Sequence, residues 1–309
     1  LPLNVSRSAL QNDGFVQKIS EYIAKKVADK LTGMCKTDRE AYEKYWDDIS
    51  PFIKFGCIKD SKFADKLHDY ILFKDLDNKY LTLKDCIEAN KKEEAEHTEE
   101  ETQENAEEKE PEKTTVFYVT DPVQQSQYIN MFKEAGKNAV ILSHNIDTAF
   151  ISHLEQRDQT LQFKRIDADL TEELKGGDAA DDDTAKTLTE LFRKNLNKEK
   201  LEVKVESLKN EAVSAMMMLS EESRRMQDMM KMYNMYGMDP NMFGGQETLV
   251  LNINHPLVKF LAENQESEHA AVICEQLYDL AMISHKQLSP DEMTKFVQRS
   301  NEILLMVAK

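Results

Sequence analysis

Residues 116–166 read VFYVTDPVQQSQYINMFKEAGKNAVILSHNIDTAFISHLEQRDQTLQFKRI, and this stretch decides the fold class of the chain. Its apolar segments VFYVT, AVILS and LQFKRI predict three strands, and helical patterns over 122–135 and 146–155 lie between them. Because strand and helix alternate through short connections, the stretch predicts a right-handed parallel α/β unit. Its loops contain neither the GxGxxG nor the Walker pattern, which favours a scaffold over a nucleotide site.

Upstream of this unit, the sequence predicts a small helical bundle. Apolar residues recur at helical spacing over 15–34, and further amphipathic helices are expected over 38–49 and 60–72. The single tryptophan, Trp46, is expected to anchor the core of this bundle.

Two segments interrupt the predicted folded parts. Residues 88–113 are dominated by acidic side chains and hold almost no large apolar ones, so they cannot offset the entropy of ordering. We interpret them as a disordered loop, with an acidic docking tail as the alternative. The sequence GGDAADDD over 176–183 marks the expected domain boundary.

Beyond this boundary, the pattern is typical of an α+β domain. It predicts helices over 183–195, 268–286 and 290–308, and strands over 201–208 and 248–253. The last helix should begin cleanly, because its first residues are a serine N-cap, a proline and, at the third helical position, a glutamate that completes a capping box.

Most of the chain's 15 methionines lie in residues 215–243. A methionine stripe at helical spacing is usually part of a core, and a plain core stays the alternative here. Cores normally select leucine and isoleucine, however, whereas flexible, polarizable methionine suits a surface that accepts many shapes. We therefore predict an adaptable protein-binding surface. The side chains expected to form it are Met226, Met229, Met230, Tyr233, Met235 and Tyr236.

Composition argues against several classes of function. The formal net charge of -17 disfavours nucleic acids and anionic membranes, both of which attract basic surfaces. No apolar run approaches the about 20 residues that a membrane helix needs. The four cysteines form no CxxC pair, which favours small buried side chains in a reducing cytoplasm. The chain begins at Leu1 without a methionine, as expected for a piece of a longer protein.

No self-contained active site is visible in the sequence. The seven histidines form no HExxH motif and no metal-ligand pair, and no GxSxG elbow is present. We therefore expect no metal site and no enzyme activity from this chain alone. Arg7 stands out, because a guanidinium on an exposed loop can stabilise charge that develops on a transferred γ-phosphate. A plain surface arginine is the alternative.

The segment LPLNVSRSALQ, residues 1–11, resembles a signature of the heat-shock protein 90 family, usually written with SREML or SREIL before the glutamine. The resemblance continues in family order through YEKYWDDISPFIKFGCIKD (42–60), VFYVT and LVLNINHPLVKFL (249–261). It covers nearly the full length. The ending LLMVAK lacks the MEEVD tail of eukaryotic cytosolic members and also KDEL, which favours the bacterial branch.

This resemblance implies a multidomain α+β and α/β chaperone fragment. The implied parts are the rear of the family's middle domain, a linker and a C-terminal dimerisation domain, at 1–169, 170–183 and 184–309. Within the first part, the helical bundle, the acidic loop and the small αβα unit would occupy 1–87, 88–113 and 114–169.

The resemblance also implies catalytic roles for two residues. In the family, the motif arginine reaches the γ-phosphate of ATP and the following glutamine supports that loop, which assigns these roles to Arg7 and Gln11. Both would assist ATP hydrolysis by an N-terminal domain that binds ATP and Mg²⁺ and is missing here. The motif glutamate is replaced by Ser8, so no role is carried over for it.

The implied partners are a second copy of the chain and client proteins. The last two helices would form a four-helix bundle with their symmetry mates, and the methionine-rich segment would face unfolded or partly folded clients. The alternative for these helices is that they only fill their own core. The rival functions are a structural dimerisation scaffold and a stand-alone enzyme with an unseen site. The residues expected in the dimer interface are Ile273, Leu277, Leu280, Ala281, Phe296, Val297, Ile303 and Leu304.

Overall fold

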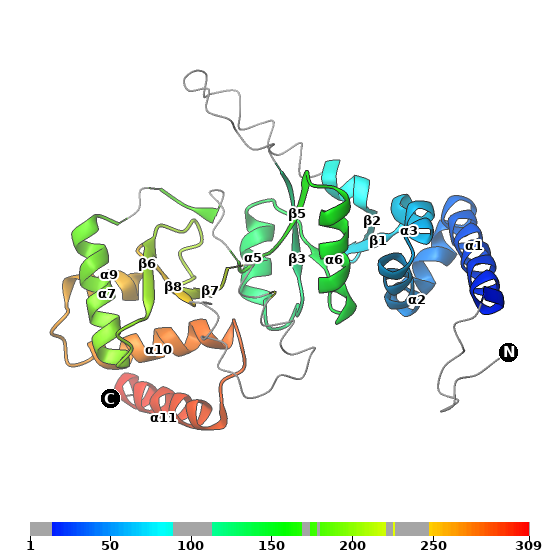
Figure 1. Cartoon of the computed structure of the whole chain (residues 1–309). Coiled ribbons are helices and arrows are strands. Elements are labelled where there is room, and N and C mark those ends of the chain that lie inside the picture. The colour runs from blue at the N-terminus through cyan, green and yellow to red at the C-terminus, as the bar shows by residue number, and fades with distance from the viewer. Residues whose placement is uncertain are drawn as a thin grey trace, which may run out of the picture. The chain divides into compact units, whose positions relative to one another are not determined.

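The computed structural model describes residues 14–88, 113–168, 174–177, 180–220, 225 and 247–308. Its helices and strands give the mixed α+β architecture that the sequence predicts (Figure 1). Contacts between Cα atoms group the chain into two compact units. Unit 1 comprises Leu1–Val116 and Leu142–Phe163, and unit 2 comprises Phe117–Ile141 and Lys164–Lys309. The domain boundary predicted at 176–183 stays a prediction.

Unit 1 begins with the expected helical block. Its helices are α1 (Gly14–Thr37), α2 (Arg39–Lys59) and α3 (Ser61–Leu67). The side chain of Asp38 caps α2 by accepting from the backbone N–H of Ala41, and Asp60 caps α3 in the same way. Trp46 is buried, as predicted.

Helix α2 extends ten residues beyond its predicted end at 49 and contains Pro51. A proline inside a helix removes one helical hydrogen bond, which disfavours continuation of the helix. Packing overrides it here, because the buried stripe begun by Tyr42 and Trp46 continues through Ile53 and Cys57.

A buried ion pair joins α2 to α6 (Ile146–Arg157) within unit 1. Lys54 Nζ donates to Asp147 Oδ1 at 2.5 Å, and the other carboxylate oxygen accepts from the backbone N–H of His144 at 2.9 Å. Both charged groups are buried and have lost their hydrating water. The attraction between them offsets the free-energy cost of that loss.

The helix predicted over 60–72 is wrong in its last part. After α3 the chain makes one turn of 3-10 helix, η1 (His68–Tyr70), and then the antiparallel hairpin β1 (Leu72–Asp75) and β2 (Tyr80–Thr82). The cause is turn chemistry that helical periodicity overlooks. The Asp75 carboxylate accepts from two turn N–H groups, and Asn78 has a φ of 63°.

The alternation predicted over 116–166 is confirmed. Its elements are β3 (Thr114–Val119), α5 (Ser126–Glu134), β4 (Val140–Ile141), α6 and β5 (Leu161–Arg165). The pair β3–β4 is parallel, with Tyr118 opposite Val140, and the sheet order is β2-β1-β4-β3-β5. Helix α5 starts four residues later than predicted, because Asp121 and Gln125 hold 121–125 as a turn.

The rest of unit 2 is built on a three-stranded sheet with the order β6-β8-β7. Its strands are β6 (Glu202–Glu206), β7 (Ala215–Met218) and β8 (Thr248–Asn252). Strand β8 pairs parallel with β6 and antiparallel with β7. Helices α7 (Asp182–Leu196), α9 (Pro256–Glu263) and α10 (Ala270–Ile283) supply side chains to its core. The sequence patterns did not predict α9.

The first methionines of the methionine-rich stretch belong to this core. Met216, Met217 and Met218 lie in β7 and are buried, so the expectation of an adaptable surface is wrong for them. Four apolar residues in succession fit a strand covered on both faces, whereas the spacing further along the stretch is helical. Cys57, Cys86 and Cys274 are also buried, while Cys35 is partly exposed.

Candidate functional site

The candidate site in the described part of the chain is the pair of helices at its C-terminal end. The predicted catalytic pair, Arg7 and Gln11, lies outside the described residues. So do the residues predicted to bind clients, which are Met226, Met229, Met230, Tyr233, Met235 and Tyr236.

Among the described residues, no group of three or more His, Cys, Asp or Glu side chains is placed to hold a metal ion. No described helix combines the length and the apolar character that crossing a membrane requires.

Helix α10 turns most of its predicted interface residues inward. Leu277 and Ala281 lie in the core of unit 2, and Ile273 is partly buried against that core. Leu280 is the exposed member of the set, at 44%. The same apolar stripe on a helix can face the chain's own core or a partner, and periodicity alone does not distinguish the two.

Helix α11 (Pro290–Val307) carries the other half of the predicted set. Phe296 and Ile303 are half-buried, whereas Val297 and Leu304 are exposed. With Met293 these two form a line at positions i, i+4 and i+11 along one face of the helix. We call Met293, Val297 and Leu304 the outer stripe. They are 41%, 49% and 65% exposed.

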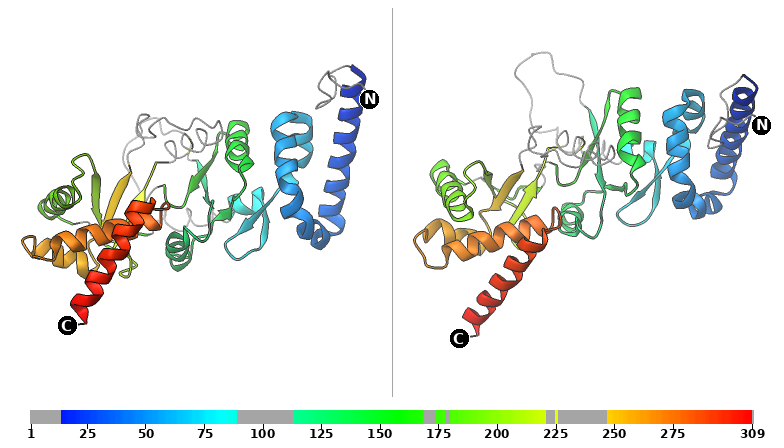
Figure 2. Two further views of the ribbon diagram at one scale, coloured as in Figure 1. Left: turned by 90° about the horizontal axis from the view of Figure 1, so that it is seen from below. Right: turned by 60° about the horizontal axis from the view of Figure 1, so that its bottom comes forward.

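The C-terminal end of α11 extends this open apolar surface. Leu305, Met306 and Val307 are all exposed. In both views of Figure 2, this end of the red helix projects away from the orange α10. The capping box that starts α11 is formed as predicted, with Ser289 and Glu292 bonded reciprocally.

The contact between α10 and α11 contains a marked polar element. Arg299 is the one buried residue among the 18 of α11. Its Nη1 donates to Asp279 Oδ2 at 3.0 Å, and its Nε lies 3.5 Å from Glu275 Oε2. Nearby, Gln276 Nε2 donates to Ser300 Oγ at 3.1 Å. The core cluster of unit 2 includes no residue of α11.

Asp279 is held in a crowded acidic setting. Burial raises its pKa above the ordinary value, the Arg299 charge opposes this rise, and the carboxylates of Glu292 and Glu275 add to it. The Arg299 charge therefore offsets the repulsion that the Asp279 carboxylate experiences from these two glutamates.

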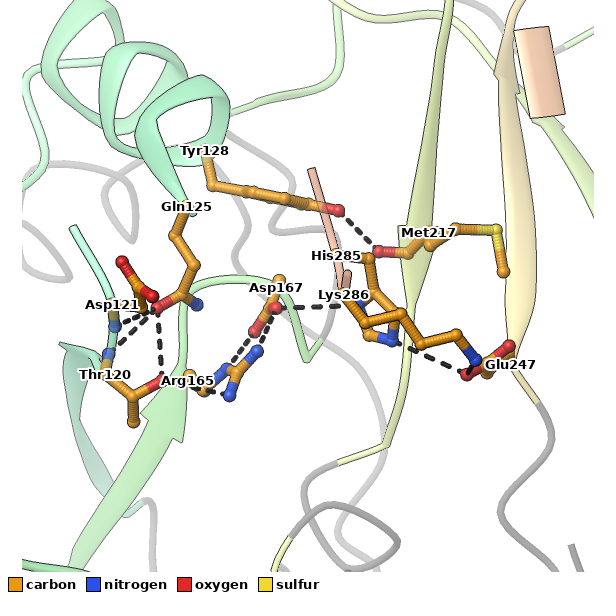
Figure 3. A network of polar contacts seen from close by, with 10 residues as sticks. All are labelled: Thr120, Asp121, Gln125, Tyr128, Arg165, Asp167, Met217, Glu247, His285 and Lys286. Atoms are coloured by element: carbon orange, nitrogen blue, oxygen red, sulfur yellow. Dashed lines mark hydrogen bonds and ion pairs between the residues drawn. The ribbon is translucent and has the colours of Figure 1, made fainter. Parts of the chain in front are cut away.

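A second polar network supports the C-terminal end of α10 (Figure 3). His285, two residues beyond α10, has Nδ1 3.8 Å from Asp167 Oδ2 and Nε2 3.7 Å from Glu247 Oε1. Arg165 forms a two-pronged contact with Asp167, with both N–O distances 2.6 Å. Lys286 Nζ reaches Glu247 Oε1 at 2.5 Å.

This network ties strand ends to the turn between α10 and α11. Burial works to raise the pKa of Glu247, but the contacts from His285 and Lys286 outweigh it and lower the pKa to about 2. Tyr128 of α5 adds a bond from its hydroxyl to the carbonyl oxygen of Met217 at 2.6 Å. The turn that leads into α11 is thus anchored on both sides.

Sequence reasoning missed both polar groups. Arg299 is a single charged residue in an amphipathic helix, and its partners lie 20 and 24 positions earlier. The capping box and helical spacing predict α11 itself, but they do not predict which charged residue is turned inward.

Comparison with known protein families gives one match that spans the chain. The family model described as "Hsp90 protein" matches residues 1–308.

Curated relatives agree with this match. A chaperone protein HtpG of Bacteroides fragilis is 34% identical over 285 residues, which covers 88% of this chain and 39% of the relative. The chaperone protein HtpG of Bacteroides thetaiotaomicron is 30% identical over 316 residues, covering 98% and 42%. That of Porphyromonas gingivalis is 32% identical over 285 residues, covering 86% and 38%. The chain thus spans less than half the length of these relatives.

Proposed function

Because the chain belongs to the Hsp90 protein family, we propose that it is the dimerising and client-binding part of an ATP-driven molecular chaperone. The observation that carries the dimer is the open apolar surface of α11, formed by the outer stripe and the C-terminal end of the helix. Each large apolar side chain that becomes fully covered contributes about 1.5 to 3 kcal/mol, which favours a covered state.

A second copy of the chain is the occupant that we propose for this surface. A two-fold axis would place the same stripe on both copies, so each α11 would cover the other. Leu280 of α10 is also exposed and would extend the contact. Leu277 and Ala281, which the chain itself already covers, would support this surface from beneath.

The remaining parts of the proposed function rest on family membership and on the sequence. Arg7 and Gln11 would assist ATP hydrolysis in the longer protein, where ATP and Mg²⁺ bind to another domain. Clients would contact the segment that contains Met226, Met229 and Met230. We expect the protein to work in the bacterial cytoplasm, without a nucleic acid or membrane partner.

The experiment that tests the dimer is sedimentation equilibrium of the chain at micromolar concentration. We expect the wild type to be a dimer, and Val297→Glu with Leu304→Glu to be a monomer, because a buried carboxylate without a partner opposes association. The matched control is Gln298→Glu, which places a carboxylate at an exposed site off the stripe and should leave the dimer intact. A wild-type monomer would refute the dimer.

Two activity assays on the wild-type chain distinguish the rival functions. A chaperone part should suppress the aggregation of an unfolded client, and Met229→Glu with Met230→Glu should remove that activity. A wild-type dimer without such activity would support the structural scaffold instead. Turnover of ATP by this chain alone would support the stand-alone enzyme.

A further inference from the structure

We infer that Arg299 is a positioning residue that fixes the rotation of α11 and keeps the outer stripe turned toward a second copy of the chain. This inference rests on the proposed dimer, because the stripe needs a partner to cover it. It adds a residue that decides which face of the helix the partner meets.

The starting observation is that the most deeply buried residue of α11 is charged. A surface helix normally turns its apolar stripe to its own core and its charged residues to water. In α11 the fully buried residue is Arg299, and Phe296 and Ile303 are half-buried, while the outer stripe is exposed. Rotation of the helix about its axis by roughly a quarter turn would bring the outer stripe against α10, since successive residues are about 100° apart.

The charges between the two helices explain why this rotation does not occur. Arg299 bonds to Asp279 and lies beside Glu275, so turning the helix would separate the guanidinium from both carboxylates. Asp279 is itself largely covered, with 15% of its side chain exposed. Leaving a partly buried carboxylate without its cation is strongly destabilising. Rotation would bury more apolar surface, but only the exposed part of each outer-stripe side chain would contribute to that gain in free energy.

Two further contacts hold the helix at this setting. Gln276 Nε2 donates to Ser300 Oγ, so a second residue of α11 is also bonded to α10. At its start, α11 follows a turn in which Lys286 is bound to Glu247. The start of the helix is therefore fixed, while its C-terminal end projects away from α10 (Figure 2).

The variant that tests the inference is Arg299→Leu. Leucine has no charge to pair with Asp279, so the present rotation loses the ion pair that holds it and the outer stripe can turn toward α10. We expect the dissociation constant of the dimer to rise at least tenfold, with helical circular dichroism unchanged. Lys295→Leu is the matched control, because it also replaces a cation by leucine on α11 but at an exposed site. It should dimerise like the wild type.

A charge exchange distinguishes positioning from a general loss of stability. Arg299→Asp combined with Asp279→Arg restores the ion pair with its direction reversed, and it should recover much of the dimer that Arg299→Asp alone loses. If Arg299→Leu lowers helical content, the double variant tests the inference instead. A double variant that recovers its helical content but does not recover the dimer contradicts the inference.

The inference and the proposed dimer fail in different ways. If Arg299→Leu dimerises as tightly as the wild type, Arg299 does not set the rotation, although the dimer stands. If the wild type itself is a monomer at micromolar concentration, the proposed dimer is wrong and the inference falls with it.

Discussion

At the scale of single residues, charged groups fix the part of unit 2 that precedes the terminal helix. Glu247 stands at the start of β8 and receives His285 and Lys286 from the turn after α10. Because its pKa is lowered to about 2, the folded state favours its ionised form more than the unfolded chain does. Such a group stabilises the fold above its unfolded pKa, and this contribution is lost as the pH falls through the folded value.

We expect Glu247→Gln to lower the unfolding free energy by an amount that depends on pH. At pH 6 we expect the variant to lose about 1 to 2 kcal/mol of unfolding free energy, after allowance for solvent screening of a partly exposed carboxylate. The deficit should shrink as the pH falls from 4.5, the ordinary value for glutamate, towards about 2. Urea titrations at several pH values, followed by circular dichroism, measure it.

The control for this prediction is Glu263→Gln, at an exposed site at the end of α9. It should change the unfolding free energy by less than about 0.5 kcal/mol at every pH. If the deficit of Glu247→Gln were the same at pH 6 and pH 3, the ionised carboxylate would not be the stabilising group.

A residue's role could be predicted from the sequence where its partners lie within a few positions of it along the chain. The capping box of Ser289 and Glu292 was predictable because its partners are three positions apart. Asp279 and Arg299 meet only when two helices pack, so neither signals the contact in the sequence. The burial of Leu277 in the chain's own core was likewise not predictable, because an apolar stripe can face either that core or a partner.

At the scale of elements, α2 shows how one helix can serve a core and a solvent face at once. Tyr42, Trp46 and Ile53 are buried on one side, and the rings of Tyr42 and Trp46 lie 5.4 Å apart. Phe52, next to Ile53, is 79% exposed on the other side. Hydrophobicity alone ranks these neighbours as equals, yet they have opposite roles in packing.

Alanine substitutions at Ile53 and Phe52 should differ in their effect on the unfolding free energy. Ile53→Ala should lower the unfolding free energy of unit 1 by about 2 to 4 kcal/mol, because it leaves a cavity in the packed face. Phe52→Ala should change it by no more than about 0.5 kcal/mol, because that ring contacts mostly water and alanine favours helix. Denaturant unfolding followed by Trp46 fluorescence reports on this helix directly. Equal losses at both sites would contradict the assignment of the two faces.

The elements that the sequence predicted best were long or strongly alternating. Helices α1, α7, α10 and α11 and the β3-to-β5 alternation appear where periodicity placed them. The hairpin β1–β2 and helix α9 were missed because each is short and depends on local turn or cap chemistry. In α9 that chemistry is a histidine N-cap, His255, whose ring nitrogen accepts from Leu257 N–H.

At the scale of the whole molecule, the net charge of -17 bears on association. Two copies that dimerise bring like charges together, so each approach is opposed by long-range repulsion. The open surface of α11 is apolar, however, and its attraction does not depend on ion pairs across the contact. The long-range and short-range contributions therefore respond differently to salt.

We expect added salt to strengthen the dimer. Raising sodium chloride from about 0.05 M to 0.5 M shortens the screening length from about 14 Å to 4 Å, which weakens repulsion between the two copies while leaving the apolar contact intact. The dissociation constant should fall severalfold in sedimentation measurements. Replacing exposed acids far from α11 along the chain, with Glu199→Lys and Glu211→Lys, should flatten this dependence because it reduces the net charge. A dimer that weakens with salt would instead be held by ion pairs between copies, and the apolar face of α11 would not be its main contact.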